Sequence, residues 1–186
     1  MRRFAAVLVL AGLVLSRPAI AQQNGAAAGG RTTIYTVKGI LLMPGEAYVE
    51  EADAYFDIDM SFGVSGTIDA KLGDRIWGGV YLDLLNVSAF DESALMFDGG
   101  VGIKAAFGGV NGKPLWRPGI GFGYGNLSSN AGLDATQYLT IRAGVEAILP
   151  SGWLAEALIY AAPTGGNDDF TITYGPMVQL RFGRAF

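Results

Sequence analysis

The chain has 186 residues, with no cysteine and no histidine, and a formal net charge of −4. The lack of histidine removes the commonest general base and transition-metal ligand, and the lack of cysteine excludes disulfides. We therefore expect a protein that is not an enzyme and holds no cofactor. The acidic balance also argues against a nucleic-acid partner.

Residues 1–21 have the plan of a cleaved signal peptide. Arg2 and Arg3 precede an apolar run over 4–15, and small residues follow at Ala19 and Ala21. The run is shorter than the roughly 20 residues that a membrane-spanning helix needs. We expect cleavage after Ala21 and export of the remainder. That mature chain has 10 basic and 17 acidic residues, a net charge of −7.

Residues 22–31, "QQNGAAAGGR", have no periodicity and are expected to form a flexible lead-in. From 32 to 186 the hydrophobic period is two. In "QYLTIRAGVEAIL" (137–149) apolar side chains such as Leu139 and Ile141 alternate with polar ones such as Thr140 and Arg142. This alternation indicates strands with one apolar and one polar face.

Eight such segments can be placed between turn signals, which predicts an all-β fold, an eight-stranded antiparallel up-and-down β-barrel. Short connections, 73–75, 108–114 and 150–152, alternate with longer and more acidic ones, 43–53, 88–93, 127–136 and 164–169. Pro176 lacks an N–H and suggests a local bulge in the last strand. The expected strands cover 32–42, where the alternation is blurred, and 54–71, 76–88, 95–107, 115–126, 137–149, 153–162 and 170–186.

Charged residues fall on the polar face of these strands. A soluble barrel would turn its apolar face inward, whereas a membrane barrel turns it to lipid and keeps the polar face in the lumen. The overall hydrophobic content, 51% with a mean hydropathy of +0.32, favours the second arrangement. The predicted lumen network, held by ion pairs, contains Lys38, Asp57, Asp59, Asp69, Lys71, Asp83, Asp98, Lys104, Arg117, Arg142, Glu146, Glu156 and Arg181.

The aromatic residues lie at two levels. Each tryptophan, Trp77, Trp116 and Trp153, follows within two residues of a short connection. Aromatic side chains at one level are typical of a membrane interface, so we expect these three and Phe186 to form an interface belt. The aromatic residues expected near the other rim are Tyr55, Phe90, Tyr124, Tyr138, Tyr160 and Phe170.

The chain ends in "VQLRFGRAF", an alternating strand that stops on Phe186. Together with the signal peptide and the eight segments, it resembles the small Gram-negative outer-membrane barrels of the OmpA, OmpX and OmpW type over essentially the whole mature chain. The resemblance implies residence in the outer membrane, contact with lipid and lipopolysaccharide, and recognition of the last strand by the barrel-assembly machinery. Arg184, on the outward face, departs from the pattern, but a long side chain at the strand end can reach the interface.

Eight strands leave an interior that side chains can fill, so we expect a plugged lumen and a structural or surface-interaction role. A conduit for small apolar molecules is an alternative, suggested by Leu154, Leu158 and Tyr160 on the parity of Glu156. A soluble periplasmic barrel carrying a ligand is a further one. A lipid-modifying enzyme is disfavoured because the barrel acyltransferases and deacylases that this chain would resemble rely on histidine.

Two weaker metal hypotheses arise from acidic residues. Asp57 and Asp59 have an Asp-x-Asp spacing that metal sites use, although the lumen network explains both residues as well. The acidic outer loops could share divalent cations with lipid phosphates, since hard cations prefer oxygen ligands, although solvated loops explain the same charge. The candidates there are Glu46, Glu50, Glu51, Asp53, Asp168 and Asp169.

Overall fold

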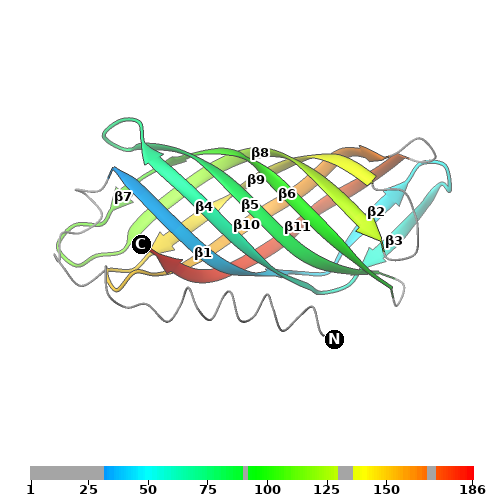
Figure 1. Cartoon of the computed structure of the whole chain (residues 1–186), viewed down its shortest axis with the longest axis horizontal. Coiled ribbons are helices and arrows are strands. Elements are labelled where there is room, and N and C mark those ends of the chain that lie inside the picture. Colours follow the sequence, from blue (N-terminus) through cyan, green and yellow to red (C-terminus); the bar gives the residue numbers. More distant parts are fainter. Residues whose placement is uncertain (1–31, 90–91, 130–135, 167–170) are drawn as a thin grey trace.

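The structure is a computed structural model that describes residues 32–89, 92–129, 136–166 and 171–186. The expected signal peptide and lead-in lie outside these residues, as do Phe90, Phe170, Asp168 and Asp169. Within the described ranges the chain forms antiparallel strands that surround a common axis (Figure 1). No helix in this part of the chain is long and apolar enough to cross a membrane.

Eight long strands form the barrel wall, and the alternation of apolar and polar residues in each one determines which side chains point inward. Consecutive long strands pair antiparallel around the wall, which confirms the predicted up-and-down topology. They are β1 (Thr33–Leu42), β4 (Ser61–Lys71), β5 (Ile76–Ala89), β6 (Glu92–Ala105), β8 (Leu115–Ser129), β9 (Thr136–Ile148), β10 (Trp153–Gly166) and β11 (Thr171–Ala185).

The first and last strands close the sheet. β1 pairs with β4 on one side and with β11 on the other, from Thr36 opposite Ala185 to Leu42 opposite Gln179. Beyond the ladder, the backbone N–H of Phe186 donates to the carbonyl of Tyr35 at 2.8 Å. Residues 33–42 therefore form a full barrel strand, although their alternation in the sequence is blurred. Closure leaves no open edge in the wall itself.

A second hairpin extends one end of the barrel. β2 (Gly45–Val49) and β3 (Ala54–Ile58) pair with each other, and β2 also pairs with β11. Both lie at the end opposite the C-terminus (Figure 1). Two predictions were wrong here: residues 43–53, expected to be a loop, contain β2, and residues 54–71, expected to be a single strand, are divided into β3 and β4. At the other end, the two-residue strand β7 (Phe107–Gly108) pairs with β8.

The last strand changes partner at a bulge. Tyr160 of β10 lies opposite Met177, whereas Ala162 lies opposite Tyr174, so Gly175 and Pro176 together face one residue. On its other side β11 pairs first with β2, over Ile172–Tyr174, and then with β1, from Gln179 to Ala185. This register shift confirms the bulge expected at Pro176. Proline cannot donate a ladder hydrogen bond, which explains why the bulge lies there. It marks the point where the barrel wall gives way to the hairpin.

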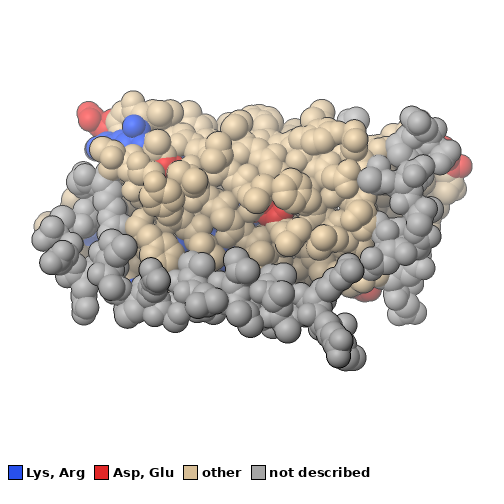
Figure 2. Space-filling view, in the orientation of Figure 1, with Lys and Arg blue, Asp and Glu red and all other residues tan. Residues whose placement is uncertain are grey.

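Large apolar side chains cover the outside of the wall. One continuous row runs across four strands through Val80, Val101, Phe122 and Ile141, which are paired in register and all exposed. The visible wall is largely free of charged atoms (Figure 2). Charged side chains point the other way, toward the axis. The faces are thus those of a membrane barrel rather than of a soluble barrel with an apolar interior.

Candidate functional site

The barrel interior is divided into three layers along its axis. On β10 the inward side chains run from Leu154 through Glu156 to Leu158 and Tyr160, apolar, charged and apolar again. The layer at the short-turn end, here called the turn-end plug, contains Ile34, Trp77, Leu115, Ile148, Leu154 and Ala185. The layer at the hairpin end, the hairpin-end core, includes Ile40, Leu42, Ala47, Ile58, Leu85, Val87, Met96, Tyr138, Leu158, Tyr160, Ala162, Tyr174 and Met177.

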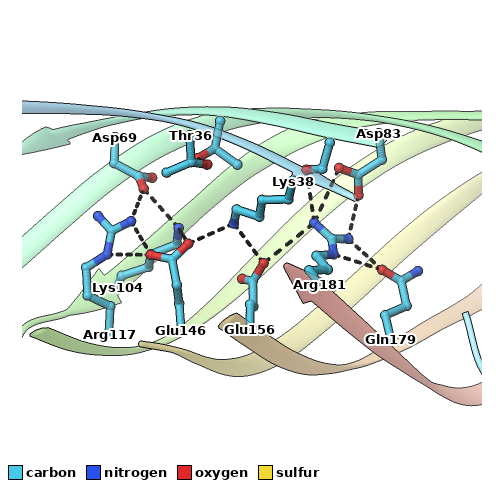
Figure 3. Close-up of polar contacts among 12 residues, drawn as sticks. Thr36, Lys38, Asp69, Asp83, Lys104, Arg117, Glu146, Glu156, Gln179 and Arg181 are labelled. Atoms are coloured by element: carbon cyan, nitrogen blue, oxygen red, sulfur yellow. Dashed lines mark hydrogen bonds and ion pairs between the residues drawn. The ribbon is translucent and has the colours of Figure 1, made fainter. Parts of the chain in front are cut away.

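Between these two layers lies a charged belt, whose ion pairs connect strands on opposite sides of the barrel (Figure 3). Arg181 of β11 donates to both carboxylate oxygens of Asp83 on β5, at 3.3 and 2.6 Å. Arg142 approaches the same carboxylate at 3.2 Å. Arg181 and Asp83 are almost completely buried. Ionised groups buried in this way need opposite charges and hydrogen bonds close by.

The belt continues toward the turn-end plug. The Lys38 ammonium lies 2.8 Å from an oxygen of Glu146 and 2.7 Å from one of Glu156. Glu146 also accepts a hydrogen bond from the guanidinium of Arg117. Arg117 and Lys104 each place a nitrogen 2.9 Å from Asp69. The connected groups therefore extend from β1 to β11 as one network.

The belt balances its own charge. Five basic and five acidic side chains face the interior in this layer, and Asp98 is the acidic member without an ion pair among the described residues. Its Oδ1 accepts a hydrogen bond from Thr140 at 3.2 Å, while its Oδ2 has no hydrogen-bond partner in the described structure. The ten are Lys38, Lys104, Arg117, Arg142, Arg181, Asp69, Asp83, Asp98, Glu146 and Glu156.

Glycines on β8 make room for bulky interior side chains. In "GIGFGYG" (119–125) the glycines face inward and Ile120, Phe122 and Tyr124 face outward. A Cβ on Gly123 would overlap the Tyr81 hydroxyl, and one on Gly125 would overlap the Tyr138 ring. The Arg142 guanidinium lies over the Tyr81 ring, 3.0 Å from its centroid. The glycine run therefore serves packing, since no described helix follows it to form a phosphate site.

Three predicted members of the network lie elsewhere. Asp57 and Asp59 are exposed, because the chain between β3 and β4 shifts phase and Ile58 takes the inward position instead. Ser61 holds this irregular segment, donating to the Asp59 carbonyl at 2.9 Å and accepting from the Ser88 N–H at 3.2 Å. Lys71 lies at the barrel mouth, half-buried, without an ion pair in the described structure. The predicted lumen position of Asp57 and Asp59 was therefore wrong.

The aromatic residues divide between the two faces. Trp116 and Trp153 are 51% and 52% exposed on the outside, as expected, whereas Trp77 is 3% exposed and lies in the turn-end plug. Trp77 and Asp83 lie an even number of positions apart on β5, so their side chains point to the same face. The sequence alone therefore indicated that Trp77 points inward. Phe186 is half-buried beside β1. At the other end Tyr55 and Tyr124 are exposed, but Tyr138 and Tyr160 are buried. Tyr138 shares the inward face of β9 with Glu146, and Tyr160 shares that of β10 with Glu156.

The acidic hairpin residues Glu46, Glu50, Glu51 and Asp53 are all exposed. The Glu51 carboxylate accepts the backbone N–H of Thr171 at 2.7 Å, and this hydrogen bond lowers its pKa below the usual 4.5. Asp53 accepts from the Tyr48 hydroxyl at 2.9 Å, which raises the pKa of Tyr48. Outside the gaps in the description, no three acidic side chains are placed to hold a metal ion. A divalent cation that these residues share with lipid phosphates stays a prediction.

Sequence reasoning missed several polar interior residues. Thr36 and Thr67 share a hydrogen bond at 2.6 Å, and Gln179 accepts from the Arg181 guanidinium at 2.6 Å. These three residues lie at alternate positions with charged interior residues of their strands, so the alternation could have identified them. The hairpin residues Ala47 and Ile58 could not be found from the alternation, because the hairpin itself was not predicted. Leu158 and Tyr160, considered as conduit residues, lie in the packed hairpin-end core, and Leu154 lies in the turn-end plug.

Solved structures share this architecture. Neisserial surface protein A (NspA) is 8% identical, with a TM-score of 0.52, over 81% of this chain and 96% of that one. The outer membrane protein OprG from Pseudomonas aeruginosa is 11% identical, also with a TM-score of 0.52, over 83% and 95%. The chain therefore has the fold of the small outer-membrane β-barrels. No protein-family model and no curated protein sequence matches it.

Proposed function

We propose that this protein is an integral outer-membrane β-barrel of a Gram-negative bacterium, exported by its signal peptide and without catalytic activity. The observation that carries the proposal is the inversion of the barrel, which has apolar side chains outside and a balanced charged belt inside. In water, this arrangement would expose the apolar rows, which is unfavourable. In a bilayer the same rows contact lipid.

The size of the apolar band supports the proposal. On β8 the outward side chains run from Trp116 to Tyr124, eight residues further along. At about 3.3 Å per residue and a tilt of roughly 40°, this distance corresponds to about 20 Å along the axis. Membrane barrels have apolar bands of about 25 Å between aromatic girdles. Trp116 and Tyr124 are thus suitably placed for the two interfaces.

Fractionation and heat modifiability test this proposal. The protein, expressed in a Gram-negative host, should appear in outer-membrane fractions and migrate faster on a gel when unboiled, because a closed barrel resists unfolding by detergent. A soluble periplasmic protein with one heat-independent mobility would overturn it.

We further propose that the lumen is plugged and that the role of the barrel is structural or surface-directed. The two apolar layers lie above and below the belt, and Arg117, Arg181 and Glu146 are essentially inaccessible to solvent. This packing supports a lumen that offers hydrated ions no path. Reconstitution in planar bilayers should give no stepwise conductance, and steady ohmic channels would contradict the plug.

The β2–β3 hairpin, among lipopolysaccharide, is the natural surface for contacts outside the cell.

The final strand is the proposed recognition element for the barrel-assembly machinery. β11 closes the wall, and the Phe186 backbone already bonds to Tyr35, so the terminal side chain is not needed to complete the ladder. Phe186→Ala should reduce the amount of folded barrel in cells while leaving unfolding of the purified barrel in vesicles nearly unchanged. An equal loss in both measurements would indicate a purely structural role for the side chain.

A further inference from the structure

A pocket of about 400 Å³ opens at the mouth of the barrel, on the short-turn side. Its floor is formed by Trp77 and Leu115, both members of the turn-end plug, and its wall by Ala106, Phe107, Gly108 and Val110. The volume lies within the range of about 300–1,000 Å³ that small-molecule sites occupy. Because the plug forms the floor, the pocket faces water along the axis rather than lipid.

The rim of this pocket is cationic. Lys71 and Arg75 line it together with Asp74, and neither basic side chain has an ion pair within the described ranges. Elsewhere in the interior the basic residues are matched by carboxylates. The pocket thus combines an apolar floor with a net positive charge at its opening, from two basic side chains and one carboxylate, although the whole protein is acidic.

We propose that this mouth pocket binds a small water-soluble amphiphile that carries one carboxylate. The apolar part would lie on Trp77 and Leu115, and the carboxylate would be held between Lys71 and Arg75. Charge complementarity selects an anion over a cation or a neutral analogue. The volume limits the apolar part to one ring or a short chain. The inference goes beyond the proposed function, since a structural barrel needs no such site.

The test uses the full barrel in nanodiscs and three matched probes: 3-phenylpropionate, 3-phenylpropylamine and 3-phenylpropanol. Two-dimensional NMR follows the amides of Ala106 and Gly108 and the indole N–H of Trp77. We expect saturable shifts with the carboxylate, and weaker binding of the amine and the alcohol. The double variant Lys71→Gln, Arg75→Gln should weaken carboxylate binding by about fivefold, as loss of an exposed charge contact does.

Lys113→Gln is the control, because Lys113 is exposed in the turn between β7 and β8, which also contains the lining residue Val110, but Lys113 itself does not line the pocket. It should bind the carboxylate as the unaltered protein does. Equal shifts with all three probes, or carboxylate binding that the double variant leaves unchanged, would overturn the proposal, as would the absence of shifts. Incorporation of the barrel into nanodiscs is measured before the probes are added. A failure of the membrane assignment can therefore be distinguished from a failure of the pocket proposal.

Discussion

Arg181 and Asp83 form a two-pronged ion pair across the barrel interior, from strands that are not neighbours in the sheet. Arg181→Met leaves Asp83 with only part of its charge compensation. Loss of one partner of a buried pair costs about 3–5 kcal/mol. We expect a loss of this size in urea unfolding of the vesicle-inserted barrel.

A double-mutant cycle with Asp83→Asn separates the pair from its surroundings. Because Arg142 also contacts Asp83, the two single substitutions should not have equal effects. Contacting residues couple by about 0.5–3 kcal/mol, so the double variant should be more stable than the sum of the two losses implies. Strict additivity would contradict a direct interaction.

The outward face of β8 provides a depth-dependent prediction. Ile120 is 51% exposed and lies midway between Trp116 and Tyr124. Ile120→Arg places a charge at the expected bilayer midplane, where it should cost about 2–4 kcal/mol. Leu72→Arg, at a position 67% exposed in a turn, should cost less than about 1 kcal/mol. Equal costs in urea unfolding from vesicles would rule out this depth assignment.

The seam between β1 and β11 requires close backbone approach. A Cβ on Gly183 would overlap the carbonyl of Val37, whereas one on Gly66 would meet nothing within 4 Å. Gly183→Ala should destabilise the barrel by about 1–3 kcal/mol, as overpacking does, and reduce the heat-modifiable form. Gly66→Ala is the matched control and should behave like the unaltered protein. The seam would not be tightly packed if both variants folded equally well.

The hydrogen bond between Glu51 and Thr171 predicts a local pH effect. Because the N–H of Thr171 lowers the pKa of Glu51, the contact is complete above the ordinary pKa of 4.5 and is lost as pH falls through the lower folded value. The Thr171 amide resonance should titrate below pH 4.5, and Glu51→Gln should abolish that titration. A midpoint above 4.5 would show that the hydrogen bond does not form.

The alternation of residues was sufficient to predict the barrel, because period two fixes which side chains share a face. It also placed Lys38, Glu146 and Arg181 on the polar side. It failed at Asp57 because a phase shift between two strands leaves no mark in the hydrophobic pattern. The prediction failed at Trp77 because it was assigned to the membrane interface from its position near a turn. Its spacing from Asp83, which places it on the inward face of the strand, was overlooked. The β2–β3 hairpin depends on nonlocal pairing with β11, which no local pattern specifies.

The central claim, that the outward apolar side chains contact lipid and the inward-facing ones do not, is tested most directly by tryptophan fluorescence. Single-tryptophan variants, each keeping Trp77, Trp116 or Trp153, are inserted into vesicles that contain brominated lipid. Trp116 and Trp153 should be strongly quenched, and the buried Trp77 should be nearly unaffected. Quenching of Trp77 with protection of the other two, or no quenching at any position, would contradict the account.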